Sequence, residues 1–131
     1  MQKKVKKNTK ITLRKDGILK YTEQAKLDKK ISEKNYEKVL NLMKKMKPPR
    51  KMLVDLSVVV MPPVESRKII VKMISSGWTK IAVFGTDSIA IKTISKFIML
   101  TAGVNNFKFF ATEQEALKWL KSNDKKTNPI R

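Results

Sequence analysis

The chain has 131 residues, no cysteine, no histidine and a formal net charge of +19 at pH 7. A chain of this length suits one domain with its own core. The two missing residue types exclude disulfides, thiolate or imidazole metal ligands, cysteine nucleophiles and Ser-His-Asp triads. A metal held only by carboxylates stays possible, but no cluster of Asp and Glu suggests one. Because the usual set of acid–base and nucleophilic residues for catalysis is incomplete without His and Cys, we expect a protein that is not an enzyme and needs no cofactor or metal.

The termini differ in character from the rest of the chain. Residues 1–8 are basic, but no apolar stretch follows them, so they are not a secretory signal. No apolar run approaches the roughly 18–20 residues that cross a bilayer. We expect a cytoplasmic protein without a transmembrane segment. A disordered basic arm (1–8) would precede the domain (9–122), and a polar tail (123–131) would follow it.

The positive charge is concentrated in the first part of the chain. Residues 1–51 carry a net charge of +13 and residues 52–131 a net charge of +6. Such a field attracts nucleic acid and anionic lipid. However, 26 of the 30 cations are lysine, whereas specific readout favours arginine. Two interpretations stay open: a solvated lysine surface with weak, non-specific binding, or a functional nucleic-acid or anionic-membrane surface in residues 1–51.

The first predicted elements are a β-hairpin and a helix. Ile11–Leu13 and Ile18–Tyr21 flank an Asp-Gly pair, which is a strong signal for a tight turn. Residues 25–31 form a connection of ambiguous structure. Ser32 is expected to cap a helix with an apolar stripe at three- and four-residue spacing, which ends before the Pro-Pro pair at 48 and 49.

The central predicted element is the stretch Lys51–Ser57, an apolar run broken only by Asp55. Such a run fits a strand buried on both faces. Two further strands and three further helices then alternate along the chain. The strands are expected near 81–84 and 106–110, and the helices near 63–76, 89–102 and 113–120, with Pro63 at the first helical position and a Thr112–Glu115 capping box on the last helix. This alternation indicates an α/β fold.

The order of these elements, with Leu53-Val-Asp-Leu-Ser57 and Glu115-Ala-Leu-Lys-Trp-Leu120 as its strongest pieces, resembles the STAS-like domains of bacteria. These are relatives of the sporulation anti-sigma-factor antagonists. The closest likeness is to an uncharacterised branch described as STAS-like or phosphatidylinositol-transfer-like and lipid-binding. The resemblance implies a single α/β domain with a mixed sheet of four to five strands, opened by an N-terminal hairpin. About four helices would pack mainly on one face of that sheet.

The resemblance also implies a non-enzymatic regulatory module that contacts a protein partner or binds an apolar or lipid ligand. In the antagonists, a serine in an Asp-Ser-Ser-Gly turn is phosphorylated at a helix N-terminus. The matching stretch here, residues 62–66, reads Pro-Pro-Val-Glu-Ser and lacks the Asp and the Gly. Its only hydroxyl, Ser66, falls just inside the predicted helix. Phosphorylation of Ser66 is therefore not expected to act as a switch.

Several residues in or after predicted strands, and one at the start of a predicted helix, are candidates for a ligand or partner site. The candidates are Asp55, Ser57, Ser66, Gly85, Thr86, Asp87 and Ser88. Asp55 is expected to be buried, either as a general base or ligand anchor, or as a structural partner for backbone N–H groups or a nearby lysine. The stretch 85–88 is expected to meet a ligand at the sheet edge or to cap a helix. Ser57 and Ser66 are hydroxyls of the switch region or ordinary turn residues.

A set of apolar residues is expected either to line a cavity for an apolar ligand or to form an ordinary core. The set is Met61, Val64, Ile91, Ile98, Met99, Phe107 and Trp119. The identity of the protein partner is open, as is the formation of a homodimer.

Overall fold

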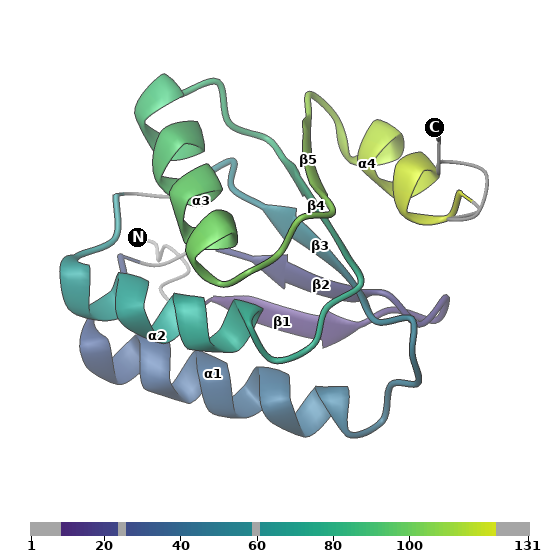
Figure 1. Cartoon of the computed structure of the whole chain (residues 1–131), viewed down its shortest axis with the longest axis horizontal. Coiled ribbons are helices and arrows are strands. Elements are labelled where there is room, and N and C mark those ends of the chain that lie inside the picture. The colour runs from purple at the N-terminus through teal and green to yellow at the C-terminus, as the bar shows by residue number, and fades with distance from the viewer. Residues whose placement is uncertain (1–8, 24–25, 59–60, 123–131) are drawn as a thin grey trace, which may run out of the picture.

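A computed structural model describes residues 9–23, 26–58 and 61–122 of the chain (Figure 1). The predicted arm (1–8) and tail (123–131) lie outside these residues. The strands are β1 (Lys10–Leu13), β2 (Leu19–Thr22), β3 (Lys51–Asp55), β4 (Lys80–Phe84) and β5 (Phe107–Phe110). The helices are α1 (Lys29–Met43), α2 (Val64–Ile74), α3 (Ile89–Thr101) and α4 (Glu113–Leu120). The protein is a single α/β domain that opens with a hairpin, as predicted.

The five strands form one mixed sheet in the order β1-β2-β3-β4-β5. β1 and β2 are antiparallel, and each later strand lies parallel to the one before it. Each connection from β2 onward crosses over to the next strand in the same direction across the sheet. Because such crossovers are right-handed, their helices all lie on the same face of the sheet. Accordingly, α1, α2 and α3 cover one face, while α4, which follows the edge strand, packs on the other (Figure 1).

Period-two alternation divides the core between the two faces of the sheet. Met52 and Val54 of β3 point to the α1–α3 side, while Leu53 points to the α4 side. All five residues of β4 are buried. The stretch predicted to be central forms β3, which is the middle strand of the sheet. It is covered on both sides.

A buried lysine and a surface ion-pair cluster attach α4 to the sheet. Lys80 of β4 is 0% exposed, and its Nζ donates to the Trp119 carbonyl over 2.8 Å and lies 4.5 Å from the centre of the Trp119 ring. At the hairpin, Lys20 pairs with Glu113 over 3.0 Å. Asp16 accepts from Arg14, and this hydrogen bond is the largest cause that lowers the pKa of Asp16 to about 2.

Two predicted helix starts are corrected by the structure. Asp28, not Ser32, caps α1: its Oδ1 accepts from the Ile31 N–H over 2.8 Å, so the helix begins within the predicted connection. Asp is as good a cap as Ser and comes first along the chain. Ser32 is instead 1% exposed. Pro63 is the N-cap of α2 with extended backbone, one position before the helix.

Candidate functional site

The carboxyl ends of three parallel strands meet at one edge of the sheet. The Glu23 N–H, just after β2, donates to the Asp55 carbonyl over 3.1 Å, and the Leu56 N–H, just after β3, donates to the Phe84 carbonyl over 2.9 Å. In open α/β sheets, ligands bind at such edges. This edge therefore gathers predicted site residues from the ends of β3 and β4.

Asp55 and Ser57 form a compact turn at this edge, and Gly85, just after β4, packs against it. The Asp55 Oδ1 accepts from the Ser57 N–H over 2.9 Å and from the Ser57 hydroxyl. Gly85 has a φ of +99°, and a Cβ on it would stand 3.0 Å from the Ser57 nitrogen and 3.1 Å from the Asp55 Oδ1. The expectation of a buried Asp55 is wrong, because the strand ends there and the side chain is only partly covered. Its carboxylate acts as a backbone acceptor.

Thr86, Asp87 and Ser88 make the turn that leads into α3. The Thr86 hydroxyl accepts from the Ser88 N–H over 3.1 Å, and the Ser88 hydroxyl accepts from the Ile91 N–H over 3.2 Å. Ser88 is thus the N-cap of α3, as one of the two interpretations predicted. Asp87 is exposed. The turn positions α3 at the sheet edge.

Ser66 lies inside the first turn of α2 and not on the exposed surface of this edge. It is the third residue of the helix and 0% exposed, and its hydroxyl has no hydrogen-bond partner among the described residues. A partner protein cannot touch it while α2 is packed. Ser57, by contrast, is exposed at the rim.

An apolar pocket of about 80 Å³ lies between the sheet, α2 and α3. Of the predicted apolar set, Ile91, Ile98 and Met99 line it. The others do not: Met61 and Val64 are 38% and 58% exposed. Phe107 lies on edge strand β5, and Trp119 packs against Phe110 on the opposite face of the sheet, with ring centres 5.7 Å apart. Only Trp119 is separated from the pocket by the sheet, because Phe107 packs against the same core cluster as Ile98 and Met99. Sequence spacing does not reveal these differences.

Glu23, which was not among the predicted site residues, is the acidic residue that lines this pocket. It is 3% exposed, and its Oε2 accepts from the Thr9 hydroxyl over 2.9 Å. Asn35 of α1 donates to Thr9 over 3.2 Å and to the Tyr21 hydroxyl over 3.3 Å. Burial raises the pKa of Glu23. The alternation Leu19, Tyr21, Glu23, which continues one face of β2, was the available signal for its inward position.

Helix α3 exposes large apolar side chains on its outer face. Ile89, Phe97 and Leu100 are 81%, 63% and 55% exposed, and with exposed Thr93 they follow a spacing of four, four and three residues. This spacing places them on one side of the helix. Because α3 carries apolar residues nearly all round, the spacing of these residues along the sequence does not show which side of the helix faces the core.

Comparison with known proteins identifies a family. A family model described as SpoIIAA-like matches residues 24–121, which is more than half of the chain. No curated protein matches the sequence. Among the described residues, none of the helices has the length and apolar character needed to span a membrane. The same part of the chain holds no group of three or more acidic side chains that could bind a metal ion.

Proposed function

Because the chain belongs to the SpoIIAA-like family, we propose that it is a non-enzymatic regulatory module that binds an acidic protein partner through the outer face of α3. The family suggests a regulatory protein-interaction module. The observation that supports this location is the row of exposed apolar side chains at Ile89, Phe97 and Leu100. Apolar side chains exposed in a contiguous patch mark interaction sites.

The charges around this row favour an acidic partner. Helix α3 contains Lys92 and Lys96 and no acidic residue. Neither lysine forms an ion pair within the described parts of the chain. An amphipathic helix with acidic flanks would cover the apolar row and pair with these lysines.

A second copy of this chain fits the same face less well. A two-fold contact would bring Lys92 and Lys96 of both copies together, and each chain carries a charge of +19. The predicted edge residues Ser57 and Ser88 are exposed near the start of α3. They would form the polar rim of the interface, where contacts contribute little energy.

The test is photo-crosslinking in the native cells from position 97, with position 38 on α1 as the control. We expect position 97 alone to crosslink to an acidic, amphipathic segment of another protein. The purified partner should then bind Phe97→Ala at least about tenfold more weakly, as for the loss of a central aromatic contact. Lys38→Ala should bind unchanged. Crosslinks to a second copy, to lipid or to nucleic acid, or equal binding by both variants, would refute the proposal.

A further inference from the structure

The pocket between the sheet, α2 and α3 combines apolar walls with one buried acid. Met52 and Val54 form part of its floor, Met73 and Ile74 come from α2, and Ile94 and Ile98 come from α3. At about 80 Å³ it is roughly half the volume of an engineered 150 Å³ cavity that binds benzene. It has room for a short chain of a few carbons.

The pocket is open to a ligand because α3 covers it incompletely. Of the 13 residues of α3, only Ile98 and Met99 are buried. Ile91 and Ile94 line the pocket and yet are partly exposed. An apolar group that entered between α2 and α3 would therefore remove these side chains from water.

Glu23 lacks a cationic partner among the described residues. Its contacts there are the Thr9 hydroxyl and Tyr21, both neutral, although the side chain is only 3% exposed. A buried carboxylate is costly unless it is paired with a positive charge and hydrogen-bonded. The hydroxyl of Thr9 supplies one hydrogen bond but no charge.

We propose that this pocket binds a small cationic amphiphile, with a short alkyl chain against α2 and α3 and its ammonium group on Glu23. The site is separate from the outer face of α3 and does not depend on the partner proposed above. A fatty acid would place its own carboxylate beside Glu23, so it is disfavoured. The net positive charge of the chain opposes this binding little, because salt screens charges beyond about 8 Å.

The two tryptophans provide a built-in reporter and control. The Trp78 Nε1 donates to the carbonyl of Met73, a pocket residue, over 3.1 Å. Trp119 packs on the opposite face of the sheet. Titrations of the full chain with hexylamine, hexanol and hexanoate, followed by the two indole N–H signals in NMR, should move the Trp78 signal with hexylamine most strongly. The Trp119 signal should stay in place.

Two variants then separate the acid from the cavity. Glu23→Gln should weaken hexylamine binding by about tenfold or more, as expected for the loss of a charge-assisted hydrogen bond. The affinity for hexanol should be unchanged. Ile98→Phe, which fills the pocket, should abolish both, and far-UV circular dichroism checks that each variant is folded. The proposal fails if hexanoate or hexanol binds as well as hexylamine, if Glu23→Gln binds hexylamine normally, or if no ligand moves the Trp78 signal.

Discussion

Glu23 shows how one buried side chain makes the stability of the protein depend on pH. Its pKa lies above the ordinary value of 4.5 because burial penalises the charged form. The folded state therefore holds the proton more tightly than the unfolded state does. Its contribution to the free energy of unfolding is fully present below pH 4.5 and is lost as the pH rises through the folded pKa.

This linkage gives a prediction for Glu23→Gln, which keeps the shape but cannot ionise. From about pH 4 to pH 8, the wild-type protein should lose free energy of unfolding relative to the variant. Urea denaturation at a series of pH values measures this difference. A difference that stays constant, or that changes in favour of the wild-type protein as the pH rises, would contradict the assigned environment of Glu23.

Ser66 is the second residue whose burial decides its behaviour. Because it is 0% exposed within α2, Ser66→Asp would bury an unpaired charge, and we expect it to lower the free energy of unfolding by roughly 3 kcal/mol or more. Ser88→Asp is the control, because Ser88 is an exposed N-cap at which Asp is equally favourable. Urea midpoints compare the two.

The same burial supports the prediction that no kinase of the anti-sigma type controls this protein through Ser66. Phosphopeptide mapping of protein from its own cells checks this prediction. Phosphate on a substantial fraction of Ser66, coupled to loss of the partner, would overturn it. Equal urea midpoints for Ser66→Asp and Ser88→Asp would show that α2 does not hold Ser66 in the core.

At the scale of elements, the middle strand and the outer face of α3 give opposite predictions for the same substitution. Leu53 of β3 is 0% exposed, so Leu53→Ala should cost about 2–5 kcal/mol. Leu100 of α3 is 55% exposed, so Leu100→Ala should cost less than about 0.5 kcal/mol. Thermal and urea unfolding of both variants measure these costs, and similar values would contradict the assignment of the two faces.

The glycine at the end of β4 shows that elements also depend on one another through backbone contact. The positive φ of Gly85 and its close approach to the turn of Asp55 and Ser57 join the ends of β3 and β4. This contact fixes the point at which the chain leaves the sheet to start α3. A backbone contact at the sheet edge thus helps to set the position of α3 and of its exposed apolar row.

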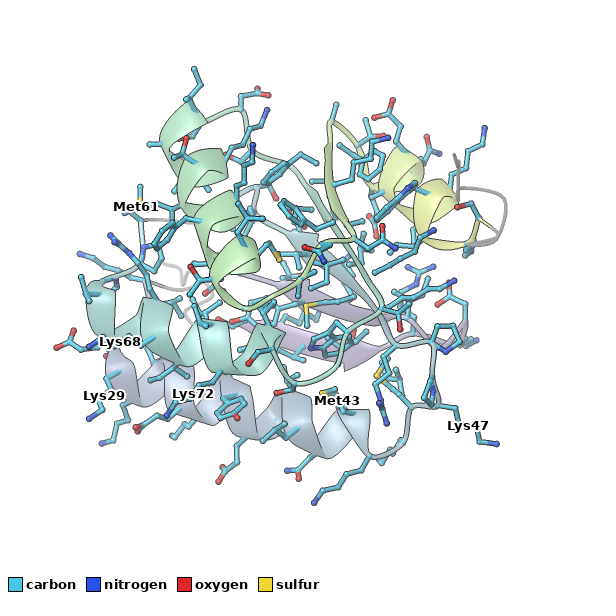
Figure 2. All side chains as sticks on the ribbon, viewed as in Figure 1. Lys29, Met43, Lys47, Met61, Lys68 and Lys72 are labelled. Carbon is cyan, nitrogen blue, oxygen red and sulfur yellow. The ribbon has the colours of Figure 1, made fainter. Side chains whose placement is uncertain are left out.

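For the whole molecule, the charge predicts weak binding to polyanions. Exposed lysines lie along α1 and α2, among them Lys29, Lys68 and Lys72 (Figure 2). Binding to generic DNA or to anionic vesicles should be measurable at low salt. The logarithm of the association constant should fall linearly with the logarithm of the salt concentration, and binding should vary little with DNA sequence. Deletion of residues 1–8, which removes four lysines, should weaken it further.

Fluorescence anisotropy with two unrelated DNA duplexes over a series of salt concentrations checks this prediction. Tight binding to one duplex that survives physiological salt would instead favour a nucleic-acid function. The lysine side chain is a compact point charge without the planar fork of arginine, so it attracts phosphate without reading bases.

The local sequence by itself determined the elements of this protein. Hydrophobic period, the Asp-Gly turn and the capping box of Thr112 and Glu115 act over a few residues, so the hairpin, the alternation of strands and helices and the middle position of Lys51–Ser57 were predicted. The start of α1 was missed because Asp28 and Ser32 are equally good caps, and only the packing of Ser32 against the core distinguishes them.

The tertiary structure decided what the elements bring together. Glu23, Thr9 and Asn35 come from three different parts of the chain and meet only when α1 packs on the sheet. Helix α3 is apolar on both sides, so the sequence does not show which side is covered. Its packing beside α2 and on the sheet leaves Phe97 exposed to solvent and buries Ile98. The local spacing of apolar residues indicates the type of element and which side chains favour burial. Which side chains are covered is fixed by the topology, because that depends on contacts between residues distant along the chain.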